Sequence, residues 1–349
     1  MTPTSFHSHG SVLVFLVALT LGALIGNLAV VALGGWRPRQ PTSKERPREL
    51  LTTSLLALSA PAIGAFIAVA AVLAVALRSW WQPNFDHCNV ATATPHLCFV
   101  HGSLHFASTW EALVVVALAL VFAAAAASEA RRQWRAHQRL RGMDVQRGDD
   151  GVWWTDDDEP YAFAAGVVRS RIVVSKGLSR ALDVGQLQAA VEHERAHIRW
   201  RDAAVRVGAR LVSALLWPSC RRQWMAMLVF AQERRADEAA AHAVGSRALV
   251  AETLLALARL QASAATTPNA TTTPAMWTPA LGDTALVARV EALCAAPPAP
   301  STQHRWHWAA AVGAVVMLAV GHAAIHDVVE WVAQTLTSTT SPHHTHTHS

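Results

Sequence analysis

The most regular feature of the sequence is a set of four long apolar stretches that contain no Asp, Glu, Lys or Arg. They are Ser11–Gly35, Thr52–Leu77, Ala112–Ser128 and Trp308–His326. A helix needs about 20 apolar residues to cross roughly 30 Å of hydrocarbon, whereas apolar segments of about 10–14 residues are more typical of buried helices in soluble proteins. The pattern therefore predicts a mostly α membrane protein with about four transmembrane helices.

The composition agrees with this interpretation and excludes several classes of protein. Apolar residues make up 52% of the 349 residues and charged residues only 15%, against about 25% charged in an average soluble domain. A disordered chain or a highly charged nucleic-acid binder is thereby excluded. Four cysteines are too few for a disulfide-rich scaffold.

The distribution of Lys and Arg predicts how the chain crosses the membrane, since cytoplasmic loops carry an excess of both. Five basic residues follow the first apolar stretch and five follow the third, whereas residues 78–108 contain one arginine. We therefore expect a multi-pass protein of a bacterial inner membrane, with residues 129–306 cytoplasmic and both termini outside. A disulfide between Cys88 and Cys98 is plausible in the outer loop. Cys220 and Cys294 are expected to be free and buried.

This topology predicts three regions. Residues 1–128 form a three-span membrane region with the outer loop 78–108, residues 129–306 a cytoplasmic α+β domain, and residues 307–349 the fourth span with a His-rich outer tail. In the middle region, Val167–Ser175 is typical of a short hairpin or edge strand, and a helical pattern starts near Asp183. Residues 203–230 predict a helical hairpin, which either lies along the inner membrane interface or is an ordinary soluble pair.

The expected helix after Asp183 carries the sequence His193-Glu194-Arg195-Ala196-His197. Two histidines four residues apart lie on one face of a helix, one turn apart, so both imidazoles can bind one Zn²⁺. The glutamate between them is placed to act on water at the metal. This is the H-E-x-x-H signature of zinc proteases, and it requires a third ligand.

A third ligand is available 36 residues after His197. Glu233 and Asp237 share a helix face, again at a spacing of four. A carboxylate completes a His₂Glu site with an open fourth position, and a second carboxylate nearby can accept the other ring N–H of a ligand histidine. The alternative is that these acids pair with neighbouring arginines on a solvated surface.

The two motifs together resemble the membrane-embedded gluzincin proteases, and among these the BlaR/MecR-type peptidases. The resemblance rests on H-E-R-A-H-x-x-x-x-D from His193 to Asp202, E-x-x-A-D from Glu233 to Asp237, the region around Tyr161, and Arg289-Val-Glu-Ala-Leu. It covers roughly residues 159–295 and the layout of the spans. HtpX-type proteases share the two zinc motifs. BlaR/MecR relatives known for antibiotic sensing carry a penicillin-binding sensor domain after the fourth span, for which residues 327–349 are too short.

The resemblance implies one zinc ion bound by His193, His197 and Glu233, with Glu194 as the catalytic general base and Asp237 in a supporting role behind the ligands. The strand Arg171, Ile172, Val173, Val174 and Ser175 is expected to hold an extended substrate by β-addition. For the group that stabilises the oxyanion, Tyr161 and His242 are candidates by residue type alone.

The sequence thus predicts an integral-membrane zinc metalloendopeptidase that acts in signal transduction by cutting a cytoplasmic protein. The expected substrate is either a transcriptional repressor or the chain itself. The alternatives are an HtpX-like quality-control protease and a zinc-containing signalling scaffold without activity. The expected partners are a protein or peptide substrate and the lipid bilayer, and no direct nucleic-acid binding is expected. The outer histidines prompt a further hypothesis, that the chain senses external metal.

Overall fold

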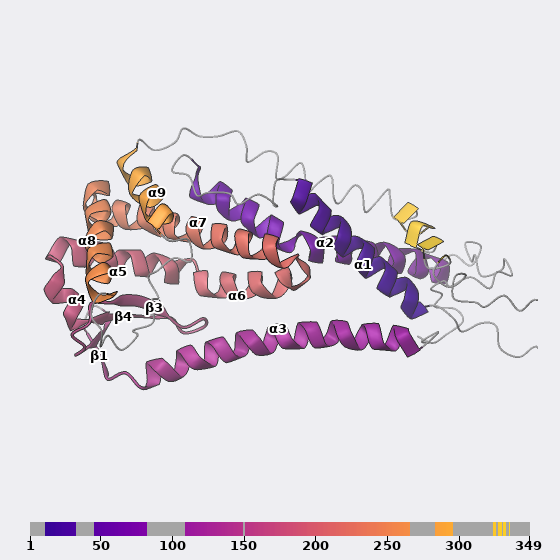
Figure 1. The fold of residues 1–349 in the computed structure, drawn as a ribbon, viewed down its shortest axis with the longest axis horizontal. Helices are drawn as coiled ribbons and strands as arrows, with labels where there is room; N and C mark the ends of the chain where they lie inside the picture. The colour runs from indigo at the N-terminus through magenta and orange to yellow at the C-terminus, as the bar shows by residue number, and fades with distance from the viewer. Residues whose placement is uncertain are drawn as a thin grey trace, which may run out of the picture.

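The computed structural model describes residues 11–32, 45–81, 109–148, 151–265 and 283–295, with short pieces between residues 324 and 335. Three long helices come first, and four short strands and six further helices follow (Figure 1). The first long helix lies towards one end of an elongated molecule and the sheet at the other, while the third long helix runs along the molecule and ends beside the sheet. The predicted fourth span at Trp308–His326 and the pair Cys88 and Cys98 fall outside the described residues, apart from short pieces of the former.

The three long helices are α1 (Ser11–Val30), α2 (Pro47–Trp81) and α3 (Thr109–Arg141). Within the described ranges, two segments are long and apolar enough to cross a membrane, Pro47–Ala74 and Ala112–Arg141, while the apolar run Val14–Val30 of α1 is shorter. Two of the predicted spans therefore lie on suitable helices. Helix α3 continues without a break past residue 128, the predicted domain boundary.

Helices α1 and α2 pack closely because small residues face each other along their contact. A Cβ atom added to Gly22 would lie 2.2 Å from the carbonyl oxygen of Gly64, and one added to Gly26 would lie 2.4 Å from that of Ala60. Such contacts are too short for any real side chain. Glycine at these positions is what allows the two backbones to approach, as small residues do at many close helix–helix contacts.

The sheet contains β1 (Val145–Arg147), β2 (Trp153–Thr155), β3 (Ala162–Ala165) and β4 (Arg171–Ser175) in the order β1-β2-β4-β3. Strand β4 is parallel to β2 and antiparallel to β3. Its side chains alternate between two clusters: Ile172 and Val174 face the core below α5 and α8, and Val173 faces the end of α3. Successive side chains of β4 thus point to opposite faces of the sheet, as in any strand, and both faces are covered.

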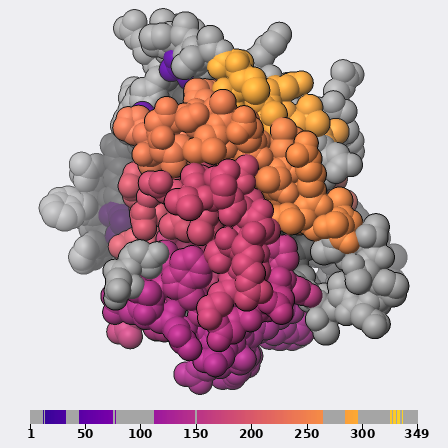
Figure 2. Space-filling view, turned by 90° about the vertical axis from the view of Figure 1, so that its left-hand side faces the viewer, coloured from indigo at the N-terminus to yellow at the C-terminus, as the bar shows by residue number. Residues whose placement is uncertain are grey.

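The remaining helices build the rest of the domain around this sheet. They are α4 (Lys176–Ala181), α5 (Val184–Arg199), α6 (Asp202–Val212), α7 (Pro218–Val244), α8 (Arg247–Ala265) and α9 (Asp283–Cys294), with a short 3₁₀ turn, η4, at Ser213–Leu215. Seen from the sheet end, α8 and α9 lie above α5, and the sheet lies below it with the end of α3 (Figure 2).

Helix α5 starts where the sequence predicts. Asp183 is its N-cap, and its side chain and that of Gln186 form a reciprocal capping box. Such a box satisfies two backbone N–H groups that the first turn leaves without partners. The predicted helical hairpin at 203–230 is also confirmed, as α6 and α7. Cys220 is buried as expected, but Cys294 is exposed at the end of α9, contrary to the prediction.

The α6–α7 hairpin joins the domain built around the sheet to the long helices. Trp224, Met227 and Leu228 of α7 share one buried cluster with Leu51 and Leu58 of α2. On the other side, Arg210 of α6 forms an ion pair of 3.0 Å with Glu129 of α3, which is 5% exposed. The hairpin therefore contacts the long helices on both sides, and it also carries part of the candidate site.

Candidate metal centre

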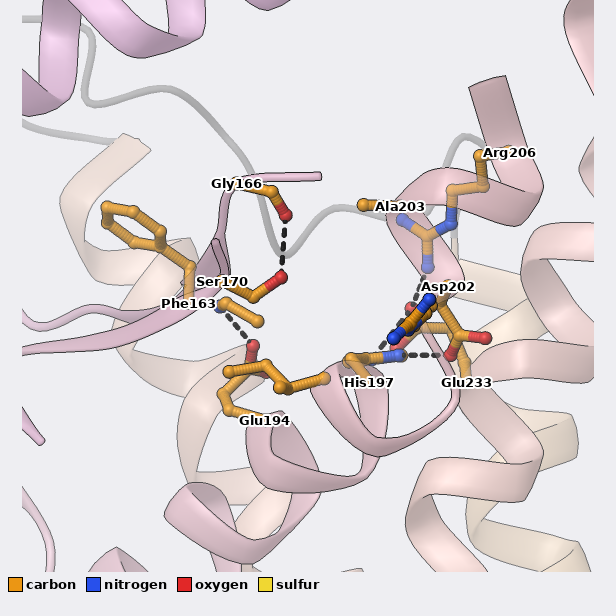
Figure 3. Close-up of a pocket in the computed structure, with 12 residues that line it drawn as sticks. Phe163, Gly166, Ser170, Glu194, His197, Asp202, Ala203, Arg206 and Glu233 are labelled. Atoms are coloured by element: carbon orange, nitrogen blue, oxygen red, sulfur yellow. Dashed lines mark hydrogen bonds and ion pairs between the residues drawn. The ribbon is translucent and has the colours of Figure 1, made fainter. Parts of the chain in front are cut away.

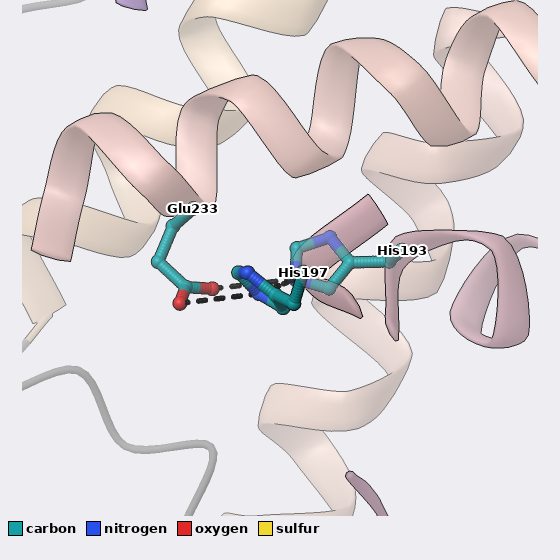
Figure 4. Close-up of side chains that lie close together, drawn as sticks. All are labelled: His193, His197 and Glu233. Carbon is teal, nitrogen blue, oxygen red and sulfur yellow. Dashed lines mark hydrogen bonds and ion pairs between the residues drawn. The ribbon is translucent and has the colours of Figure 1, made fainter. Parts of the chain in front are cut away.

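Three side chains from α5 and α7 converge at the middle of the domain (Figure 4). The Nε2 atoms of His193 and His197 lie 3.2 Å apart. Glu233 Oε2 lies 3.3 Å from His193 Nε2, and Glu233 Oε1 lies 3.5 Å from His197 Nε2. All the ligand atoms are within 4.8 Å of one another.

This donor set fits zinc in both chemistry and spacing. Imidazole nitrogen and carboxylate oxygen bind Zn²⁺ at about 2.0–2.2 Å, and a tetrahedron with arms of that length has edges of about 3.3–3.6 Å. The two Nε2 atoms are 3.2 Å apart and each lies 3.3 or 3.5 Å from its nearer Glu233 oxygen, which is close to these edge lengths. Two histidines and one carboxylate leave a fourth position open, which is typical of catalytic zinc sites rather than structural ones.

Each imidazole is held from behind by a carboxylate. Asp237 Oδ1 lies 3.0 Å from His193 Nδ1, and Asp202 Oδ2 lies 2.7 Å from His197 Nδ1. Both carboxylates are 1% exposed. A carboxylate at Nδ1 favours the tautomer with hydrogen on that atom and leaves the Nε2 lone pair free for a metal. In the structure Asp237 thus contacts His193, and Asp202, to which the sequence assigned no role, contacts His197.

Asp202 reaches His197 because the chain turns sharply between α5 and α6. Arg201 adopts a left-handed conformation with φ of 52°, and Asp202 follows as the first residue of α6. Arg235 of α7 binds the other oxygen of Asp202 and lies over the ring of Trp200, 4.3 Å from its centroid. The spacing of five residues between His197 and Asp202 is the only sequence signal for this contact.

Arg289 closes the back of the site from α9. Its guanidinium makes two hydrogen bonds of 2.7 Å to Asp237 and lies 3.4 Å from Glu233 Oε2. The residue is 3% exposed. Two parallel bonds to one carboxylate fix its orientation. Arg289 lies in one of the motifs of the sequence, but its role could not be predicted, because it is 52 residues from Asp237.

The ionisation of the site follows from these contacts. Burial by itself would raise the pKa of Asp237, but the Arg289 guanidinium outweighs it and lowers the pKa to about 2. Burial disfavours the charged form of His197, yet the Glu233 charge and the bond to Asp202 raise its pKa to about 10. The pKa of Glu233 is held well below its usual range, chiefly by His197 against the effect of burial. In the absence of metal, the site thus holds protonated histidine beside ionised carboxylates.

Glu194 lies beside the three ligands and is 4% exposed. One of its oxygens accepts a hydrogen bond from the backbone N–H of Ala164 in β3. Burial raises the pKa of Glu194 above its ordinary value, against the opposing charges of the two histidines. A carboxyl group with a raised pKa is suited to accept and then return a proton near neutral pH.

A pocket opens in front of these residues (Figure 3). It is lined by Phe163, Ala164, Gly166, Ser170, Glu194, His197, Ile198, Arg201, Asp202, Ala203, Arg206 and Glu233. One wall is therefore β3 with the turn that follows it, and the opposite wall is the start of α6. The candidate metal centre thus lies on the floor of an accessible pocket.

The predicted substrate strand requires a correction. Val173 and Val174 of β4 pair with β2 on one side and with β3 on the other, so this strand lies inside the sheet and has no open edge there. The strand at the edge of the sheet beside the pocket is β3, next to Glu194. An extended peptide can pair only with an open edge, so within the described sheet the pocket-side edge belongs to β3.

The two oxyanion candidates chosen by residue type do not line the pocket. The hydroxyl of Tyr161 donates to Asp157 at 3.0 Å and is paired with Thr155, so it is occupied in the sheet region. His242 is exposed near the end of α7. Neither residue is placed to act on a substrate in this pocket.

The first comparison with known proteins finds a family of peptidases. Residues 126–228 match the sequence model of peptidase family M48. This match covers less than a third of the chain. It includes His193 and His197 but ends five residues before Glu233, so it does not reach the third residue of the cluster.

A protease HtpX homolog of Thermoplasma acidophilum is 34% identical to this chain over 68 residues. The similar segment covers 19% of this chain and 22% of that protein, so about a fifth of each is compared. No solved structure matches the chain significantly.

Proposed function

We propose that this chain is a zinc endopeptidase anchored in a bacterial inner membrane, with its site on the cytoplasmic side. The observation that carries this proposal is the cluster of His193, His197 and Glu233 beside Glu194, on the floor of an open pocket. The match to an M48 peptidase model supports it independently of the geometry. A purely structural zinc site is disfavoured, since it would fill all four positions with protein ligands.

The residues of the chain divide the work of peptide hydrolysis among them. When bound, zinc supplies a Lewis acid that polarises a carbonyl oxygen and makes water more acidic. Glu194 takes a proton from the attacking water as the oxygen of that water bonds to the carbonyl carbon. Glu194 then delivers that proton to the leaving amine as the C–N bond breaks. Asp202, Asp237 and Arg289 hold the ligand side chains in place throughout.

The substrate lies in extended form along the edge of β3. That edge borders the pocket, and the N–H of Ala164 points to the carboxylate of Glu194. A peptide paired with β3 passes directly in front of Glu194 and the ligand cluster. Backbone pairing of this kind tolerates many side chains, because main-chain hydrogen bonds provide most of the affinity.

The decisive experiment compares the purified wild-type chain with Glu194→Gln. We expect both to bind one zinc ion per chain, since Glu194 is not a ligand. Only the wild type should then cut β-casein, used as an unfolded test substrate, or the chain itself. Equal cleavage by both proteins would contradict the proposed role of Glu194. Loss of zinc in His193→Ala and Glu233→Ala tests the ligands separately.

Two substrate classes follow from different observations. The motif resemblance to BlaR/MecR-type peptidases favours a regulatory substrate, either a transcriptional repressor or the chain itself. The similarity to a protease HtpX homolog favours quality control of damaged membrane proteins, and it accounts for the site equally well. Proteomic comparison of cells with wild-type and Glu194→Gln protein separates the two. Accumulation of one soluble repressor supports signalling, and accumulation of many membrane proteins supports quality control.

A further inference from the structure

Arg206 occupies a distinctive place in the pocket. It lies on α6, one turn after Asp202, and its side chain is 28% exposed. Figure 3 shows Arg206 on one side of the pocket and Glu194 on the other, with His197 between them. A peptide bond held in this pocket beside Glu194 would face the wall that carries Arg206.

The guanidinium of Arg206 is held in a defined orientation. Its Nε donates to Gln232 Oε1, and its Nη2 donates to Glu233 Oε1 at 3.3 Å. Gln232 is fully buried, and its amide nitrogen in turn donates to the carbonyl oxygen of Asp202 at 3.5 Å. Because the arginine is fixed by two residues of α7, the helix that also carries Glu233, it does not have to be ordered when a substrate binds.

Donors remain available on this side chain. A guanidinium has five N–H groups, and the two bonds above use one on Nε and one on Nη2. Among the described residues, Nη1 has no hydrogen-bond or ion-pair partner. Arg206 therefore offers fixed, positively charged donors at a pocket wall.

The other arginines near the site do not combine these properties. Arg289 also contacts Glu233, but it is 3% exposed and does not line the pocket. Arg201 lines the pocket but is exposed, and within the described part of the chain it has no side-chain partner that fixes its direction. Among the arginines that the structure describes, only Arg206 is both fixed and accessible from the pocket.

We propose that Arg206 binds the carbonyl oxygen of the scissile peptide bond through Nη1 and stabilises the negative charge that develops on it. This inference rests on the proposed function. As the water oxygen bonds to the carbonyl carbon, the π electron pair of the carbonyl moves onto its oxygen, and Arg206 donates to that oxygen. When the C–N bond breaks, the pair returns to form the new carboxyl group, and the amine leaves with the proton carried by Glu194.

The test uses three zinc-loaded, full-length variants, Arg206→Gln, Arg206→Lys and the control Arg199→Gln. Arg199 is exposed at the end of α5 and outside the pocket, so its change removes the same charge from the same region. The probes are a fluorogenic peptide that spans a bond cut in β-casein and the phosphinic analogue of that peptide. The analogue resembles the tetrahedral intermediate and is not hydrolysed. Zinc affinity is measured by chelator competition.

Arg206→Gln should lower kcat about 100-fold, within the range seen when one oxyanion donor is removed, while KM stays within about threefold. It should weaken binding of the phosphinic analogue by a similar factor. Arg206→Lys should recover part of both losses, because the charge is kept but the fixed planar donor is lost. These losses should persist at saturating zinc, and Arg199→Gln should behave as the wild type.

Three outcomes count against the proposal in distinguishable ways. If Arg206→Gln binds zinc weakly and regains wild-type kcat at saturating zinc, the residue only positions Glu233 and the inference is wrong. If it binds the phosphinic analogue as tightly as the wild type does, the inference is also wrong, although the protein remains a peptidase. If the zinc-loaded wild type neither cuts casein or itself nor binds phosphinic peptides, the proposed function fails and the inference fails with it.

Discussion

Asn27 and Trp217 lie 190 residues apart in the sequence, yet Asn27 Oδ1 accepts a hydrogen bond of 2.9 Å from the backbone N–H of Trp217. The amide nitrogen of the same asparagine donates to the carbonyl oxygen of Leu215 at 3.0 Å. One buried side chain of the apolar helix α1 thus satisfies two backbone groups at the turn between α6 and α7. Because α6 carries Asp202 and Arg206 and α7 carries Glu233, this contact links α1 to the hairpin that shapes the site.

Replacing Asn27 by leucine should destabilise the protein. The substitution keeps the branched shape of the side chain but removes these two part-buried hydrogen bonds, each worth about 0.5–1.5 kcal/mol. We expect a lower thermal unfolding temperature in detergent micelles. Ser59→Ala is the matched control, since the Ser59 hydroxyl bonds only to carbonyls of its own helix. An Asn27→Leu protein as stable as this control would show that the turn is held by other contacts.

Asp202→Asn should weaken zinc binding about 10- to 100-fold, the usual effect of losing a carboxylate behind a ligand histidine. The carboxylate lies 2.7 Å from His197 Nδ1 and orients the imidazole for the metal. Chelator competition measures the change directly. Glu238→Gln serves as the control, because Glu238 pairs with Arg234 rather than with a ligand. Equal zinc affinity in Asp202→Asn and the wild type would refute this role.

The metal-free protein should lose stability on both sides of a pH window. The proton on His197 stabilises the folded state below pH 6.5, and this contribution is lost as the pH rises towards the folded pKa of about 10. The ionised Asp237 stabilises it above pH 3.8, and this is lost as the pH falls towards about 2. The thermal unfolding temperature, measured in excess chelator, should therefore be highest between about pH 4 and 6.5.

Two comparisons test the origin of the alkaline loss. His197→Gln cannot carry this proton, so its unfolding temperature should vary less between pH 7 and 10 than that of the metal-free wild type. Zinc binds the unprotonated imidazole, so the zinc-loaded wild type should also lose less stability over this range. A metal-free wild type whose stability is constant from pH 7 to 10 would contradict the charged state derived for His197.

The predicted topology can be tested with a native cysteine. Of the two cysteines that the structure describes, Cys294 is exposed and Cys220 is buried. A Cys88→Ser/Cys98→Ser variant therefore keeps Cys294 as its accessible thiol. If residues 129–306 are cytoplasmic, a membrane-impermeant maleimide should label Cys294 only after the cells are permeabilised. Labelling in intact cells would reverse the orientation and place the site outside.

The site could be predicted from the sequence where it depends on a single helix. The spacing of four between His193 and His197, and again between Glu233 and Asp237, places each pair on one helix face, and the capping residues at Asp183 mark the start of α5. Helical periodicity is a property of the backbone itself. A local pattern therefore carries this information without any knowledge of the rest of the fold.

Which strand forms the open edge beside the pocket could not be predicted in the same way. Val167–Ser175 has the composition of a strand, and a strand is there, but the sequence does not show that β2 and β3 pair with it on both sides. Strand pairing joins segments distant along the chain, and the same alternation of side chains is compatible with an edge or an interior position. The expectation about substrate binding consequently fell on the wrong strand.

By itself the sequence determined the long apolar helices, the two helical motifs and the donor types suited to zinc, because each follows from composition or from the geometry of one helix. Only the tertiary structure decided that Asp202 orients His197, that Arg289 supports Asp237 from α9, that Arg206 faces the pocket, and that Asn27 holds the hairpin to α1. These contacts depend on how separate elements pack. Packing is set by the whole core, so no local pattern contains it.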